Sequence, residues 1–213
     1  MSPKTGARKR TAVLISGRGS NLAALVSASR DSDFPAEIVL VISNVEQAAG
    51  IGVAREAGIP VRIIPHGAYP SREAFDAAID AALEDEKISL VCEAGFMRIH
   101  SSEFVRKWEG RILNIHPALL PDFKGLNVHR RVLESGVTTT GCTVHFVVAE
   151  LDSGPIIAQA RVPVEPRDTK ASLAARVLEA EHRLYPEALR MVALGDVRLE
   201  NGEAVWRQRT RES

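Results

Sequence analysis

Residues 11–21 read TAVLISGRGSN, and this stretch decides the fold. An aliphatic, β-branched run ends at Gly17 and is followed by helical spacing over 21–28, which predicts a strand, a tight turn and a helix. Similar alternation predicts further strands at 37–43, 61–65, 88–95 and 111–116, with helices at 46–57 and 71–86. The pattern favours an α/β fold: a Rossmann-like open twisted sheet, mostly parallel, with helices on both faces.

The pattern changes after about residue 120. Two apolar runs at 141–148 and 155–164 are joined by a short loop, which predicts antiparallel C-terminal additions to the sheet. A long helix is predicted at 169–194, broken near Pro186. The pair Asn201-Gly202 lies between two short alternating runs and predicts a β-hairpin.

The composition is that of a folded globular protein, with 213 residues, 45 % apolar and 25 % charged. Lys plus Arg and Asp plus Glu both number 27, and the resulting zero charge disfavours nucleic acid as the main partner. No apolar run reaches about 18 residues, so no membrane span is expected. Cys92 and Cys142 lie in apolar runs and are predicted to be small buried side chains in a reducing cytoplasm.

The glycine-rich turn at 17–21 (GRGSN) is a candidate anion site. The backbone amides of residues 19–21 would point outward from a helix N-terminus, and the Ser20 hydroxyl adds a donor. A plain strand-to-helix turn with Ser20 as the N-cap explains the same residues. Leu22 stands where a third glycine of GxGxxG would be, and no Walker lysine follows, so a single phosphate monoester fits best.

A second candidate site lies at the end of the strand predicted at 111–116. Asn114 and His116 point to the same side of a strand, so an amide and an imidazole converge where open α/β sheets bind ligands. Such a pair would stabilise a negative oxygen forming on a carbonyl carbon. A strand-end histidine can equally be a hydrogen-bonded structural residue.

Asp152, in the loop ELDSG at 150–154, is a turn former unless this loop folds over His116. In that case its carboxylate would orient the imidazole and favour the charged ring. Neither GxSxG nor metal-ligand spacing among the six histidines is present. The nucleophile is therefore expected to belong to a substrate, which points to acyl-type transfer between two bound molecules.

Together these segments resemble the phosphoribosylglycinamide formyltransferase family, within the folate-dependent formyltransferase superfamily. The likeness covers residues 11–206 and rests on six runs: LISGRGSNL, SREAFD, AGFMRI, ILNIHPALLP, ELDSGP and AEHRLYP. Asn-x-His-Pro followed by a later aspartate is specific to the superfamily. The GxGSNL start, combined with this length, narrows the resemblance to the glycinamide branch.

The resemblance implies transfer of the formyl group of 10-formyltetrahydrofolate, a co-substrate, to the amine of glycinamide ribonucleotide in de novo purine synthesis, with no metal. It implies a catalytic trio of Asn114, His116 and Asp152. The nucleotide substrate would bind Gly19, Ser20, Asn21 and Glu181. The folate site would comprise Arg72, Met97, Arg98, Ile99, His100 and Asn114, along with the loop at 148–152.

The basic run MSPKTGARKR, which has no apolar core, predicts a disordered basic tail at residues 1–10, and residues 11–213 are expected to form a single domain. Its nucleotide-binding half is 11–120, and its folate-loop and C-terminal half is 121–213. The expected protein is cytoplasmic, with small-molecule substrates and no nucleic-acid or membrane partner. A homodimer is compatible with this expectation. Two residues depart from the family pattern: His100, where leucine is common, and Glu93, where an apolar strand residue is more usual.

Four other functions fit part of the pattern. Methionyl-tRNA formyltransferase usually carries an extra C-terminal domain, and formyltetrahydrofolate hydrolase an extra N-terminal regulatory domain, and neither is expected here. A non-catalytic nucleotide-binding module would not need the trio of Asn114, His116 and Asp152. A nicotinamide oxidoreductase would need the third glycine and an acid for the ribose hydroxyl, which this sequence lacks.

Overall fold

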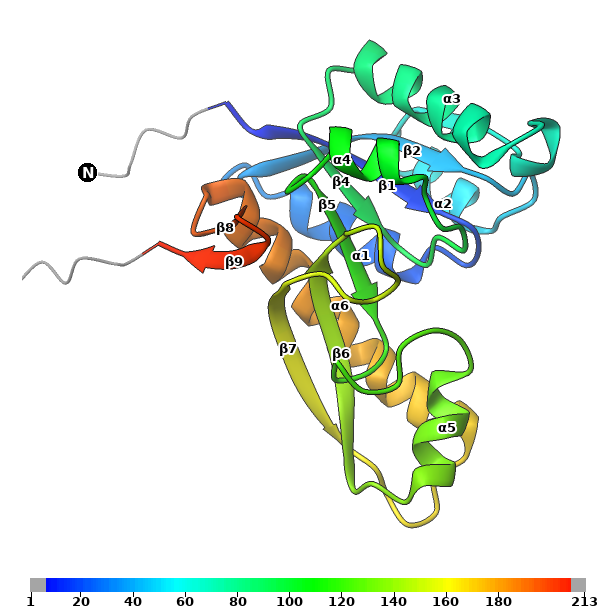
Figure 1. The fold of residues 1–213 in the computed structure, drawn as a ribbon, viewed down its shortest axis with the longest axis vertical. Coiled ribbons are helices and arrows are strands. Elements are labelled where there is room, and N and C mark those ends of the chain that lie inside the picture. Colours follow the sequence, from blue (N-terminus) through cyan, green and yellow to red (C-terminus); the bar gives the residue numbers. More distant parts are fainter. Residues whose placement is uncertain (1–6, 208–213) are drawn as a thin grey trace, which may run out of the picture.

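The computed structural model describes residues 7–207, and its centre is a seven-stranded sheet in the order β3-β2-β1-β4-β5-β6-β7 (Figure 1). Its strands are β1 (Lys9–Ile15), β2 (Ala36–Ser43), β3 (Val61–Ile63), β4 (Leu90–Glu93), β5 (Ile112–His116), β6 (Thr139–Phe146) and β7 (Ile156–Pro163). Strands β1 to β5 run parallel, and β6 and β7 are antiparallel additions. The predicted fold class is confirmed.

Helices cover both faces of the sheet, which explains why the central strands are almost wholly apolar. One apolar cluster lies beneath α1 (Ser20–Ser29), α2 (Gly50–Glu56), α5 (Val128–Ser135) and α6 (Lys170–Leu194). A second lies beneath α3 (Arg72–Asp85) and α4 (Ser102–Lys107) on the opposite face. A short 3₁₀ helix, η1 (His66–Ala68), precedes α3, which the hydroxyl of Ser71 caps at the amide of Ala74.

The predicted C-terminal hairpin is also confirmed. Strands β8 (Val197–Glu200) and β9 (Glu203–Trp206) pair antiparallel in a small sheet of their own. Asn201 and Gly202 both have positive φ, at 51° and 79°, which matches the twist of a two-residue hairpin turn. Among the helices of residues 7–207, none combines the length and apolar character that a membrane crossing needs.

Three sequence predictions differ from the structure. The sequence predicted a disordered tail over residues 1–10, and this is wrong for Lys9 and Arg10, which pair with β2. Residues 1–6 of that tail lie outside the described residues. The predicted break in the last helix is wrong too: α6 continues through Pro186, and Tyr185, Ala188 and Leu189 around it are buried, so packing outweighs the lost hydrogen bond. The short helices α4 and α5 were not predicted.

The topology places three loops close together at the carboxyl ends of the central strands. Strands β1, β4 and β5 are parallel neighbours, so the turns that follow them start side by side, and the order in which the strands are added to the sheet reverses between β1 and β4. Ser16, just after β1, donates a hydrogen bond to Asn44 Oδ1 (2.6 Å) and accepts one from the amide of Met97 (2.8 Å). This hydroxyl therefore links the loops that follow β1, β2 and β4.

Candidate active site

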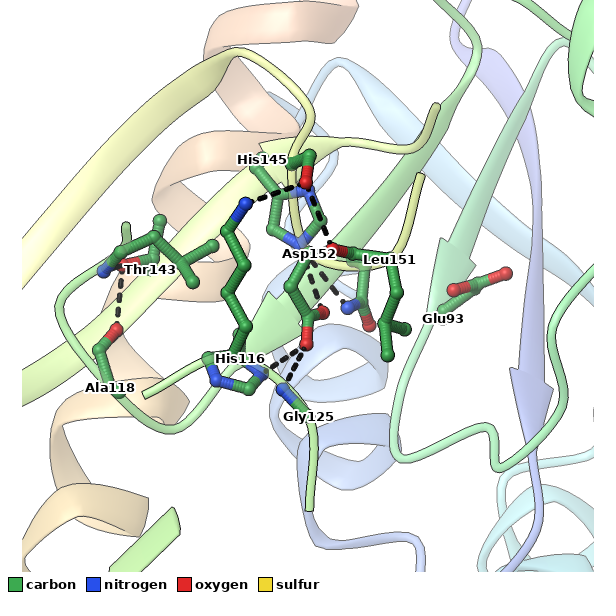
Figure 2. Close-up of polar contacts among 12 residues, drawn as sticks. Glu93, His116, Ala118, Gly125, Thr143, His145, Leu151 and Asp152 are labelled. Carbon is green, nitrogen blue, oxygen red and sulfur yellow. Dashed lines mark hydrogen bonds and ion pairs between the residues drawn. The ribbon is translucent and has the colours of Figure 1, made fainter. Parts of the chain in front are cut away.

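Polar side chains from neighbouring strands lie in a row near the carboxyl ends of β4 and β5 (Figure 2). Glu93 in β4 is the register partner of Asn114 in β5, and Asn114 is the partner of His145 in β6. Register partners point to the same face, so three polar groups stand next to one another on an otherwise apolar surface. His116 lies two residues beyond Asn114 and therefore projects from the same face.

His116 is buried between two acceptors. Its Nδ1 lies 3.3 Å from Asp152 Oδ2, and its Nε2 donates a hydrogen bond to the carbonyl oxygen of Phe123 at 3.0 Å. A carbonyl can only accept, so Nε2 carries the hydrogen of that bond, and the Asp152 carboxylate faces the other ring nitrogen. The structure thus brings together the three residues of the predicted trio, and the loop does fold over His116.

The loop that carries Asp152 is fixed by contacts with the chain after β5. Asp152 Oδ2 accepts a hydrogen bond from the amide of Gly125 (2.8 Å), and Lys124 Nζ donates one to Ser153 Oγ (2.6 Å). Asp152 itself has a φ of 49°, a left-handed conformation that aspartate tolerates better than most residues. Two loops 27 residues apart in sequence thereby hold the carboxylate against the imidazole.

His145 is a site residue that the sequence did not single out. Its Nδ1 donates to the carbonyl of Phe146 (2.8 Å), and its Nε2 lies 3.3 Å from Asn114 Nδ2. Burial lowers the pKa of His145, against the opposing effects of the Phe146 carbonyl and the Asp152 charge. The neutral ring accepts from Asn114 and fixes the amide orientation, which leaves the second N–H of Asn114 for a ligand. The only available signal was a histidine within a run of β-branched and apolar residues.

The predicted nucleotide residues also meet. Gly19, with φ 78°, is the N-cap of α1, and no side chain caps that helix, so Ser20 is not an N-cap. A Cβ at Gly19 would lie 2.5 Å from the Cα of Gly50, which makes glycine necessary there. Asn21 Nδ2 donates to Glu181 Oε2 at 2.7 Å, and burial raises the pKa of Glu181 although Asn21 and Arg18 lower it.

The predicted folate residues separate into two groups. Met97 and Ile99 expose 65 % and 48 % of their surface, Leu151 exposes 50 %, and Arg72 and Arg98 are also exposed. His100 instead lies in the interior, enclosed between the rings of Phe96 and Phe104. Asp76 and Glu93 hold its side chain inside, so it does not share the exposed surface of the other predicted folate residues.

Comparison with known proteins identifies the family. The sequence model described as formyl transferase matches residues 9–189. The chain belongs to the formyl transferase family. The phosphoribosylglycinamide formyltransferase of Escherichia coli strain K12 is 42 % identical over 194 residues, covering 91 % of both chains. The crystal structure of glycinamide ribonucleotide transformylase 1 from Symbiobacterium toebii is 46 % identical, with a TM-score of 0.91 over 94 % of this chain and 95 % of that one.

Longer relatives contain the same unit. The trifunctional purine biosynthetic protein adenosine-3 of Bos taurus is 56 % identical over 200 residues, which is 93 % of this chain and 20 % of that protein. The formyl transferase chain thus spans about a fifth of such relatives. Within residues 7–207 no group of three or more His, Cys, Asp or Glu side chains is arranged to hold a metal ion. Cys92 and Cys142 are free and buried, as predicted.

Gly154→Ala tests whether the position of the loop with Asp152 matters for the site. A Cβ at residue 154 would lie 1.7 Å from the carbonyl oxygen of Phe146, so the loop with Asp152 must move away from β6. We expect kcat for transfer to fall by at least about tenfold. The matched control is Gly52→Ala, where no atom lies within 4 Å of the added methyl group. Equal kcat for both variants and wild type, with intact circular dichroism, would contradict this account.

His100 gives a pH-dependent stability. Burial alone would lower the pKa of His100, but contacts with Asp76 and Glu93 raise it to about 9, from 6.5. Between these two pKa values the folded chain keeps a proton that the unfolded chain releases. The contribution of His100 to the free energy of unfolding is therefore complete below pH 6.5, and it should fall by about 1.4 kcal/mol per pH unit as pH rises toward 9.

Urea unfolding between pH 6.5 and 8.5 measures this slope. The window lies below the ordinary thiol pKa of 9.0, so the buried cysteines, whose pKa values are raised to about 12, contribute little there. The His100→Gln variant provides the comparison, since it lacks the titrating group. The same slope in this variant would exclude His100 as the source.

Proposed function

We propose that this protein transfers the formyl group of 10-formyltetrahydrofolate to the amine of glycinamide ribonucleotide, giving formylglycinamide ribonucleotide and tetrahydrofolate. The observation that carries the proposal is the contact of His116 with Asp152, 3.3 Å apart, on the same face as the amide of Asn114. Two relatives named phosphoribosylglycinamide formyltransferase match this chain over about nine-tenths of their own length, and their names support the choice of substrates.

The trio supplies groups that acyl transfer needs. The substrate amine attacks the formyl carbon, and its oxygen becomes negative. The free N–H of Asn114 and a ring N–H of His116 can donate to that oxygen, and one such donor typically lowers the barrier by about 3 kcal/mol. We expect the oxygen to take the place of the Phe123 carbonyl at His116 Nε2, while Asp152 holds the Nδ1 side.

Proton transfer completes the reaction. The attacking amine loses a proton, and the nitrogen that leaves as tetrahydrofolate gains one. His116, alone or through a water molecule, is the group in reach that can carry it. The exposed Met97, Ile99 and Leu151 offer apolar surface to a flat folate ring system, and holding both substrates together adds the benefit of proximity.

The turn at 17–21 would hold the phosphate of the nucleotide. The uncapped amides at the start of α1 are suited to an anion, and Ser20 is the first residue of that helix. Ser20→Asp adds a negative charge there, so we expect the KM for glycinamide ribonucleotide to rise at least about tenfold with little change in kcat. Ser20→Asn is the neutral control of similar size. An unchanged KM in Ser20→Asp would place the phosphate elsewhere.

One assay tests the proposed function directly. Purified protein is mixed with 10-formyl-5,8-dideazafolate, and the absorbance of the deformylated product is followed with and without glycinamide ribonucleotide. Product that forms only with the nucleotide supports transfer. Equal rates without it would show hydrolysis by water instead, and no product in either case would refute the proposal.

We also propose a cytoplasmic protein in which residues 11–213 act as one domain. The two free, buried thiols support a reducing compartment. The change of strand direction between β5 and β6 supports a division of this domain near residue 120 into two halves. A homodimer stays a prediction, which the molar mass measured by light scattering would test.

A further inference from the structure

The two residues that depart from the family pattern contact each other. His100 Nε2 lies 2.8 Å from Glu93 Oε1, and His100 Nδ1 lies 2.7 Å from Asp76 Oδ1. All three side chains are more than nine-tenths buried. An isolated charge is rarely tolerated in such a position, so the two carboxylates and the imidazole depend on one another.

The surroundings favour a positively charged His100. Its ring lies between Phe96 and Phe104, with centroids 5.4 and 4.3 Å away and nearly parallel planes, an arrangement that attracts a cation to the aromatic faces. Asp76 also accepts the amide of Ser101. On the Glu93 side the contact is an ion pair rather than an aligned hydrogen bond, because neither facing atom has a hydrogen-bond partner among the described residues. The Glu93 carboxylate is thus held mainly by charge.

This carboxylate lies next to the candidate oxyanion donor. Glu93 and Asn114 are register partners on neighbouring parallel strands, which are about 4.8 Å apart, and their side chains share a face. An unpaired carboxylate there could accept the N–H of Asn114 that a substrate needs. It would also repel a negative oxygen forming at the same point.

We propose that His100 is a positioning residue for formyl transfer: its imidazolium holds the Glu93 carboxylate as an ion pair and so keeps the Asn114 amide available to the reacting oxygen. The proposal rests on the proposed function, because it assigns a role toward the oxygen of that reaction. His100 acts through Glu93 and does not touch substrate.

A double-variant cycle tests the pair. His100→Leu leaves the Glu93 charge without its partner, and we expect kcat for transfer to fall at least about tenfold while the KM for the nucleotide changes little. Glu93→Leu/His100→Leu removes both charges, and its kcat should return to within about threefold of wild type. A double variant as slow as His100→Leu, or a His100→Leu variant with wild-type kcat, would overturn the proposal.

A matched control separates this effect from general loosening of the interior. Asp76→Asn removes the other ion-pair partner of His100, on α3, and leaves Glu93 paired. We expect its kcat to stay within about threefold of wild type. An equal loss of kcat in Asp76→Asn and His100→Leu would count against the proposal. If His100→Leu does not fold, His100→Gln replaces it, because it also lacks the charge and carries the same expectation.

A second readout does not depend on activity. In the ligand-free, ¹⁵N-labelled protein, the side-chain amide signal of Asn114 should shift in His100→Leu and return in Glu93→Leu/His100→Leu. An unmoved signal in His100→Leu would refute the proposed link between the ion pair and Asn114. A wild-type protein without transfer activity would instead refute the proposed function, and the amide signal would still report on the pair.

Discussion

His116→Ala is expected to abolish formyl transfer, with kcat reduced at least about a thousandfold. The substitution removes a donor to the developing oxyanion and the group placed to carry the proton. The neighbouring His145 is not placed to take over, because its ring is occupied by the Phe146 carbonyl and Asn114. Single-turnover kinetics with saturating substrates measure the chemical step, and calorimetry measures nucleotide affinity, which should stay near wild type.

The control for this prediction is another histidine at the same edge of the sheet. His66, in η1, contacts Asn44 beyond β2 and is not part of the trio. His66→Ala should keep kcat within about threefold of wild type. If His116→Ala retained most of its activity, His116 would have no part in the mechanism. If it lost nucleotide affinity as well, the loss of kcat would reflect a disturbed fold.

The sequence predicted the sheet well because its signals are local. The aliphatic runs of β1 and β2 are buried on both faces, so they read as strands without knowledge of their partners. Helix α5 was missed because VHRRVLES has few apolar residues, and Asn127 precedes it in a left-handed conformation without a side-chain cap. Helix α4 has only six residues, too few for a periodic pattern.

The candidate site was predictable only in part. The convergence of Asn114 and His116 follows from the period of a strand, whereas the approach of Asp152 depends on loop contacts that no local pattern encodes. His145 joins the site through a strand pairing with a partner 31 residues away. His100 was assigned to the folate site by resemblance, but its partners lie on α3 and β4, so only the folded structure shows that it is enclosed.

Asp152→Asn should lower kcat at least about a hundredfold and leave the fold and the KM for the nucleotide nearly unchanged. Asparagine has the same size and tolerates the left-handed φ of 49°, and its oxygen can still accept the amide of Gly125. It lacks the negative charge that faces His116 Nδ1 at 3.3 Å, so the ring loses its orientation and the support for its charged form. Stopped-flow absorbance gives kcat. Asp122→Asn, an exposed change in the neighbouring loop, should behave as wild type.

The combined variant distinguishes a direct from an indirect role for Asp152. If Asp152 acts through His116, His116→Ala/Asp152→Asn should be no slower than His116→Ala alone, because the carboxylate has no ring left to orient. If the two losses multiplied instead, Asp152 would contribute a separate effect on the reacting atoms. The contacts favour the first outcome, since the carboxylate is buried and lies closer to the amide of Gly125 and the ring of His116, at 2.8 and 3.3 Å, than to His145 Nε2 at 3.8 Å.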